Sequence, residues 1–85
     1  MSELENILAE RAKTHGEWTE VSWLCTKLKA QMRQSQNWHR LPDHQREALE
    51  QIAFKTARIL CGDSSEPDHW LDIGGYALLG GKRAP

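Results

Sequence analysis

The residues in this 85-residue sequence that are best suited to chemistry are four carboxylates at helical spacing in its second half. Glu47 and Glu50 stand three positions apart, and Asp68 and Asp72 stand four positions apart. Side chains three or four positions apart lie on the same side of a helix, where two carboxylates can share Mg²⁺. These four residues are the candidate metal ligands, and Glu47 and Glu50 are also the candidate catalytic residues.

Two basic residues lie between the acidic pairs in the sequence. Lys55 and Arg58 follow Glu47 and Glu50 in the same predicted helix. An ammonium group can hold a phosphate oxygen as a point charge, and a guanidinium group can hold two oxygens with parallel hydrogen bonds. Carboxylates and cations in this combination are what a Mg²⁺-dependent site for a nucleoside triphosphate requires.

A structural interpretation explains the same residues equally well. Asp68 can cap the last helix and complement its dipole, and Arg58 can form a salt bridge with Asp68 or Asp72. Glu47 and Glu50 can lie in solvent and pair with neighbouring basic side chains, because acidic pairs are common on helix surfaces. The two interpretations differ in whether the four carboxylates converge in space.

The spacing of the apolar residues predicts an all-α fold of four helices, arranged like a bundle, in one domain over residues 1–85. The first predicted helix begins after Ser2 and fades at residues 14–16, where Gly16 ends it. The others cover residues 17–34, 43–61 and 67–79, and a proline-containing connector occupies residues 35–42. Residues 80–85 are expected to form a flexible tail.

Several apolar residues predict a homodimer or a higher homo-oligomer. The last helix has few polar positions after its first turn, which is typical of a helix buried on most sides. Phe54 lies on the polar half of the third helix, so that half is expected to meet another surface. Four tryptophans are more than a domain of this size can hide, and large aromatic side chains are enriched at subunit contacts.

Composition excludes several classes of protein. The formal net charge is -1, which leaves no positive excess to hold a nucleic acid. No apolar run approaches the roughly 20 residues of a membrane helix, and the N-terminus has no signal-peptide pattern. Cys25 and Cys61 lie in apolar helical surroundings, as buried thiols do in a reducing compartment. We therefore expect a cytoplasmic protein that binds neither nucleic acid nor membrane.

Two motifs give the chain a resemblance to small phage and prophage proteins of unassigned function. The sequence resembles them over nearly its whole length, including residues 46–63. The most specific part is the element Asp68-His69-Trp70-x-Asp72-Ile73-x-Gly75-Tyr76, and the first helix adds Arg11-x-x-x-His15-Gly16. The resemblance implies a phage-encoded protein that acts in the host cytoplasm.

The order of the acidic pairs is also distantly similar to the all-α nucleoside triphosphate pyrophosphohydrolases of the MazG type. In that superfamily a Glu-x-x-Glu pair and a Glu-x-x-Asp pair on consecutive helices hold Mg²⁺. Glu47 and Glu50 match the first pair, and Asp72 matches the last aspartate. His69 replaces the remaining glutamate, and Asp68 is its nearest substitute. This resemblance implies pyrophosphate release from a nucleotide in an oligomeric helical enzyme.

Three functions follow from these observations. The leading hypothesis is a Mg²⁺-dependent nucleoside triphosphate pyrophosphohydrolase, in which a metal-polarised water attacks the phosphates while Lys55 and Arg58 offset the developing charge. The first alternative is a non-catalytic phage protein that binds and modulates a host protein through its tryptophans and acidic surface. The second is a nucleotide binder without turnover, which is the expected result if His69 has cost the site one metal ligand.

Overall fold

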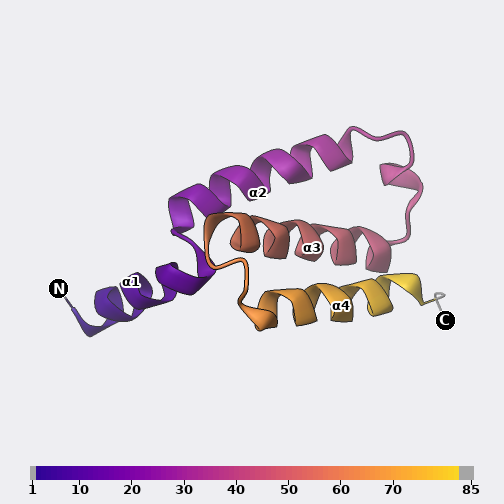
Figure 1. Ribbon diagram of the computed structural model, residues 1–85. Helices are drawn as coiled ribbons and strands as arrows, with labels where there is room; N and C mark the ends of the chain where they lie inside the picture. Colours follow the sequence, from indigo (N-terminus) through magenta and orange to yellow (C-terminus); the bar gives the residue numbers. More distant parts are fainter. Residues whose placement is uncertain (1, 83–85) are drawn as a thin grey trace.

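The computed structural model describes residues 2–82, and every regular element in that range is helical (Figure 1). The prediction of an all-α fold with four α-helices is therefore confirmed. The predicted boundaries agree with the observed ones to within two residues. The elements in chain order are α1 (Glu3–His15), α2 (Trp18–Arg33), the short 3-10 helix η1 (Trp38–Arg40), α3 (Asp43–Cys61) and α4 (Pro67–Gly81).

The ends of the helices follow local rules that are visible in the sequence. Ser2 and Glu5 form a capping box at the start of α1, in which each side chain accepts a hydrogen bond from the other residue's backbone N–H. Gly16 ends α1 with φ of 85°, a conformation that glycine adopts without a steric penalty. Pro67 occupies the first turn of α4, where its missing N–H costs no hydrogen bond.

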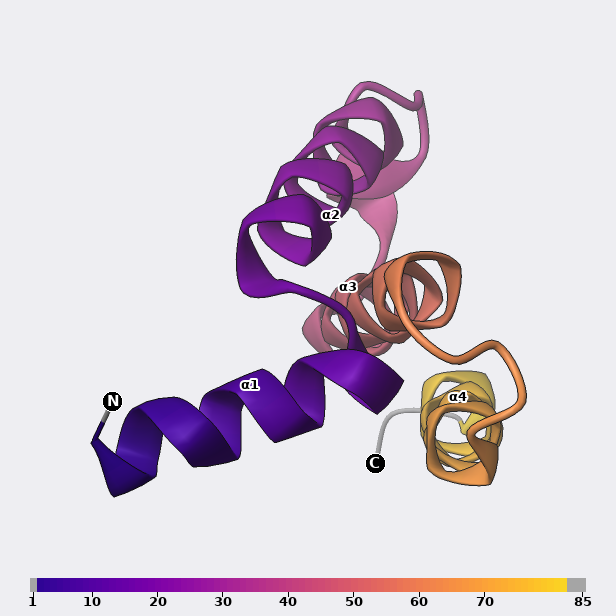
Figure 2. The ribbon, with the colours of Figure 1, turned by 60° about the vertical axis from the view of Figure 1, so that its left-hand side comes forward.

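α3 is the central helix of the molecule, with α2 packed on one side and α4 on the other (Figures 1 and 2). α4 runs antiparallel to α3. Two contacts show this register, because Lys55 pairs with Asp72 near one end and the His44 ring contacts the Lys82 carbonyl oxygen near the other. α1 projects from this three-helix body and contains no buried residue. The four helices therefore do not all pack together in one chain.

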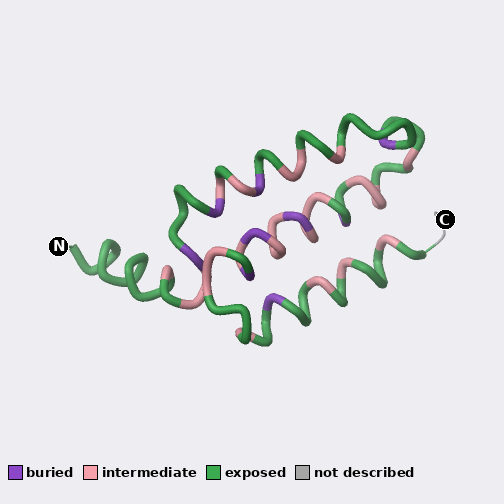
Figure 3. Tube along the Cα trace, turned by 45° about the horizontal axis from the view of Figure 1, so that its top comes forward, coloured by how far each residue is buried: buried purple, intermediate pink, exposed green. Residues whose placement is uncertain are grey.

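The core lies between α2 and α3 and is small (Figure 3). Val21 and Ala57 are fully buried, Cys25 is nearly so, and Phe54 packs against them. Small residues at 53 and 57 let α2 approach α3 closely, which suits a domain with little apolar material to bury. The surface that Phe54 was expected to meet is therefore α2 of the same chain.

α4 differs from its prediction in two ways. It was expected to be buried on most sides, but only the face towards α3 is covered, and Leu71 and Leu78 are 69% and 74% exposed. It was also expected to end at residue 79, whereas the helix continues through Gly81. The Gln45 side chain donates a hydrogen bond to the Gly80 carbonyl oxygen, which helps to hold this last turn. Of the predicted tail, residues 83–85 lie outside the described part of the chain.

Both cysteines are free thiols, as expected, with Cys25 buried and Cys61 half-buried. Burial raises the pKa of the Cys61 thiol, which keeps it protonated and unreactive at neutral pH. Within residues 2–82, none of the helices is both long and apolar enough to cross a bilayer.

Candidate functional site

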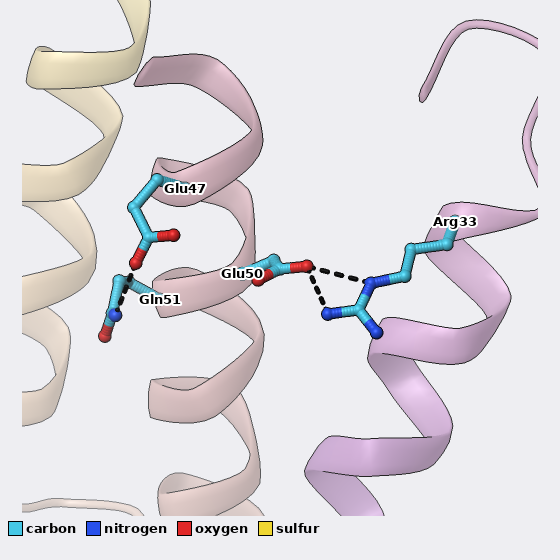
Figure 4. Close-up of polar contacts among 4 residues, drawn as sticks. All are labelled: Arg33, Glu47, Glu50 and Gln51. Atoms are coloured by element: carbon cyan, nitrogen blue, oxygen red, sulfur yellow. Dashed lines mark hydrogen bonds and ion pairs between the residues drawn. The ribbon is translucent and has the colours of Figure 1, made fainter. Parts of the chain in front are cut away.

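The first acidic pair lies on the surface of α3 and is engaged in local contacts (Figure 4). Glu50 points towards α2, where Arg33 donates two hydrogen bonds to one of its carboxylate oxygens, the Nε bond being 2.9 Å long. Glu47 accepts a hydrogen bond of 3.0 Å from the Gln51 side chain one turn further along. The neighbouring basic side chains on α3 pair elsewhere, Arg46 with Asp43 and Lys55 with Asp72, so the cation that pairs with Glu50 is supplied by α2.

The second acidic pair lies in the first two turns of α4. Asp72 forms an ion pair with Lys55 at 2.8 Å, and the Lys55 ammonium group lowers the pKa of the Asp72 carboxyl by hydrogen bonding and by its charge. Asp68 is exposed and enters no ion pair within residues 2–82. The N-cap position of α4 is occupied by Glu66, whose side chain makes no capping hydrogen bond, and Asp68 is a first-turn residue that complements the helix dipole.

The two acidic pairs do not converge within one chain. Glu50 pairs with α2 and Asp72 approaches from α4, so the two carboxylates lie on different sides of α3. In the antiparallel register, Asp68 lies about 12 residues along α3 from Glu47, or roughly 18 Å at 1.5 Å per residue. Across residues 2–82, no group of three or more His, Cys, Asp or Glu side chains is arranged to hold a metal ion.

The structure instead brings together a cluster that joins α1, α3 and α4. The Nδ1 atom of His15 lies 2.9 Å from the Nε2 atom of His69, within hydrogen-bond distance. Arg58 donates a hydrogen bond of 3.0 Å to the His15 backbone carbonyl oxygen. Lys55 and Arg58 both lie close enough to His69 to lower the pKa of its imidazole. We call His15, His69, Arg58 and Lys55 the histidine cluster.

His69 is the one polar residue in the described chain that is buried, at 2% exposure. Its Nδ1 atom has no hydrogen-bond partner. A buried N–H without a hydrogen-bond partner costs more free energy than a buried nitrogen lone pair without one. We therefore assign the proton to Nε2, which donates to His15, and Nδ1 carries no proton. Burial lowers the pKa of His69 first, and the charges of His15, Lys55 and Arg58 lower it further. His69 is therefore a neutral imidazole at physiological pH.

Arg58 also borders a hollow of about 530 Å³ between α1 and the start of α2. Its guanidinium carbon lies 5.6 Å from the centroid of the Trp18 ring and 4.8 Å from that of Phe54, which is cation–π range. We call this space the arginine hollow, and the residues that shape it include Leu8, Arg11, Ala12, Gly16, Trp18 and Arg58.

The arginine hollow has an excess of positive charge. Burial lowers the pKa of Arg58, and the charge of Arg11 lowers it further, so the two guanidinium groups are close enough to repel each other. Neither arginine forms an ion pair within the described residues. The acidic residue at the rim, Glu17, directs its carboxylate to the Glu20 backbone N–H. An anion bound between the two arginines would relieve their repulsion.

Sequence reasoning found Lys55 and Arg58 but missed the residues around them. His15 and His69 show no metal-binding spacing, and 54 positions separate them in the sequence. One local signal was available, since Arg11 and His15 are four positions apart and so share a face of α1. Only the crossing of α1 over the end of α3 shows that this face meets Arg58.

Comparisons of the chain with protein-family models, with curated proteins and with solved structures found no match. Fold and site together define an all-α protein with a cationic, aromatic hollow beside a pair of contacting histidines, of which His69 is buried.

The buried imidazole predicts a pH dependence of stability. Because folding lowers the pKa of His69, the unfolded chain binds a proton near the ordinary pKa of about 6.5 while the folded chain does not. The free energy of unfolding is therefore greatest above about pH 6.5 and decreases as the pH falls below that value. Urea titrations at pH 7.5, 6.5 and 5.5, each about one pH unit apart, measure this dependence. His69→Gln should flatten it, and His39→Gln, at the distant η1 helix, should leave it unchanged.

Proposed function

We propose that this chain is a nucleotide-binding protein that holds the phosphates of its ligand in the arginine hollow. One observation carries the proposal, namely that Arg11, Arg58 and Trp18 line a single space with no carboxylate paired to either arginine. Guanidinium groups recognise phosphate oxygens, and an indole ring offers a stacking surface for a base. A volume of about 530 Å³ is also within the usual range of small-molecule sites.

Each residue of the hollow has a separate part in this proposal. Arg58 is held in place by its bond to His15 and by its two aromatic neighbours, so its guanidinium is preorganised for binding. Arg11 is exposed on the opposite wall and supplies the second fork of hydrogen-bond donors. Lys55 lies outside the hollow, and Asp72 neutralises its charge. Arg58 and Arg11 are therefore the phosphate-binding residues, and Lys55, expected from the sequence to bind phosphate as well, lies outside the hollow.

Isothermal titration calorimetry with ATP, adenosine and inorganic tripolyphosphate tests the proposal. ATP and tripolyphosphate should bind, and adenosine should bind much more weakly because it lacks phosphate. Arg11→Gln should weaken ATP binding by at least about tenfold, since a charge-assisted hydrogen bond contributes roughly 1.5–3 kcal/mol. Arg40→Gln, on η1 and outside the hollow, is the matched control and should bind ATP normally.

A second pair of measurements separates the base from the phosphates. Trp18→Leu should weaken ATP binding by about tenfold or more, because stacking contributes about 1–3 kcal/mol. It should weaken tripolyphosphate binding less, because tripolyphosphate has no base to stack and loses only the contact by which Trp18 helps to hold Arg58. Equal binding of ATP by the wild-type protein and by Arg11→Gln would contradict the proposal, as would the absence of binding by any of the three ligands.

Hydrolysis of the bound nucleotide can be assayed with the same protein. A Mg²⁺-dependent pyrophosphohydrolase that uses Glu47, Glu50, Asp68 and Asp72 would need carboxylates from more than one chain, because those of one chain are too far apart. Pyrophosphate release from ATP and Mg²⁺ that disappears in Glu50→Gln and in Asp72→Asn would support the enzyme. ATP binding without release would leave a nucleotide binder without turnover.

A non-catalytic role at a host protein is favoured by a different observation. α1 projects from the body and exposes three apolar side chains on one face, those of Leu4, Ile7 and Leu8. A helix of 13 residues is marginal by itself in water, so such a face gains stability from a partner. Recovery of one host protein in equimolar amount by the wild-type chain, and its loss with Ile7→Lys, would support this function. Leu60→Lys, an exposed site on α3, is the matched control.

A further inference from the structure

The outer face of α4 carries a regular stripe that the proposed function does not use. Five residues follow one another at spacings of three, four, three and four, which places them on one side of the helix; the first four lie within α4 and the fifth is its C-cap residue. They are Asp68, Leu71, Gly75, Leu78 and Lys82. We call this set the α4 stripe.

The α4 stripe is uncovered in the single chain. Leu71 and Leu78 are the two most exposed large apolar side chains of the described residues. A side chain added at Gly75 would meet nothing within 4 Å, so the space above the middle of the stripe is open. The residues of α4 that do pack on α3 lie on the opposite face and include His69. An apolar seam at heptad spacing is the pattern that a helix uses to pair with another helix.

The two charged residues of the stripe lie at its ends and cannot pair with each other. Asp68 and Lys82 are 14 positions apart, which is roughly 21 Å along the helix axis. Neither side chain enters an ion pair within residues 2–82. In a second copy running antiparallel, an acid at one end would lie opposite a base at the other. In a parallel copy, like charges would meet.

We propose that two copies of this chain form an antiparallel, two-fold symmetric contact through the α4 stripe. Gly75 lies at the midpoint between positions 68 and 82, so the symmetry axis passes near it and its missing side chain lets the helices approach closely. Leu71 and Leu78 pack across the seam. Asp68 pairs with Lys82 of the partner subunit, and the same contact recurs at the other end. The charge pattern therefore selects a second copy of the chain as the occupant of this face.

A charge reversal tests the contact, with the mass in solution measured by sedimentation velocity over a range of concentrations. The wild-type chain should be a dimer. Asp68→Lys places lysine against lysine at both ends and should weaken the dimer by at least about tenfold. Asp68→Lys combined with Lys82→Glu should restore it. Such a restoration requires contact between two chains, because the two positions are too far apart to interact within one.

A substitution in the apolar seam gives a second, independent measurement. Leu78→Lys should raise the dimer Kd by at least about 100-fold, because the two-fold axis applies the change twice. Leu60→Lys replaces a leucine on α3 that is also largely exposed, at 66%, and should leave the dimer intact. A monomeric wild-type chain at all concentrations would overturn the inference. So would a dimer that resists Leu78→Lys, or one that the double charge reversal fails to restore.

The proposed dimer contact and the proposed nucleotide site can be tested independently of each other. No residue of the α4 stripe lines the arginine hollow, so Leu78→Lys should still bind tripolyphosphate as the wild-type chain does. Likewise, Arg11→Gln should leave the dimer unchanged.

Discussion

Replacing Gly62 with alanine is expected to destabilise the protein by about 3 kcal/mol, the upper end of the cost of overpacking. Gly62 directly follows α3, and the end of α1 and the link to α2 cross the chain at this residue. A methyl group there would collide with the Thr14 carbonyl oxygen and would lie 2.6 Å from the Gly16 nitrogen. These are backbone atoms, so no side chain can rotate to make room. Urea unfolding monitored by tryptophan fluorescence measures the loss.

The matched control for this prediction is Gly74→Ala. A side chain at Gly74 would meet nothing within 4 Å, and alanine favours a helix over glycine by roughly 1 kcal/mol. The control should therefore be as stable as the wild-type chain or more so. If both variants unfolded at the same urea concentration as the wild-type chain, the two segments could not approach each other as closely at Gly62 as described.

The same variant has a consequence for the site. The crossing at Gly62 brings the last turn of α1 onto the end of α3, where the Asp63 N–H donates to the Thr14 carbonyl oxygen. This turn carries His15, whose backbone carbonyl orients Arg58. Gly62→Ala should therefore weaken binding of tripolyphosphate as well as folding, even at temperatures where the protein is fully folded.

Trp38→Ala is expected to cost about 3–5 kcal/mol, because deletion of a large buried aromatic leaves a cavity. Trp38 is 6% exposed, and its helix η1 lies between α2 and α3 in the chain and contacts α2. The small core offers few other contacts to compensate, and a domain of this length has only roughly 4–13 kcal/mol of stability in total. Thermal unfolding followed by circular dichroism measures the change.

Trp23→Ala is the control, since it removes the same side chain from a position that is 64% exposed on α2. Its effect on the free energy of unfolding should stay within about 0.5 kcal/mol, as for most surface substitutions. A similar loss in both variants would mean that Trp38 is not part of the packed structure.

The sequence by itself determined the helices. The capping box at Ser2, the stop at Gly16 and the proline at position 67 are local signals, and helix ends depend mainly on such local hydrogen bonding and backbone preferences. The buried residues Val21 and Cys25 are four positions apart in α2, as the helical period of apolar residues requires of one face. These features were predictable since each depends on residues within about one turn.

Only the tertiary structure decided which of the chemically capable side chains meet. The four carboxylates shared a spacing that suited a metal, yet Glu50 turns to Arg33 on α2 and Asp72 to Lys55 on α3. His15 and His69 had no suggestive spacing, yet they touch. Contacts of this kind depend on the angle at which whole helices cross and on close approaches such as that at Gly62, which no local pattern encodes. Helical period fixes the face on which a side chain lies, and packing between distant segments fixes what that face meets.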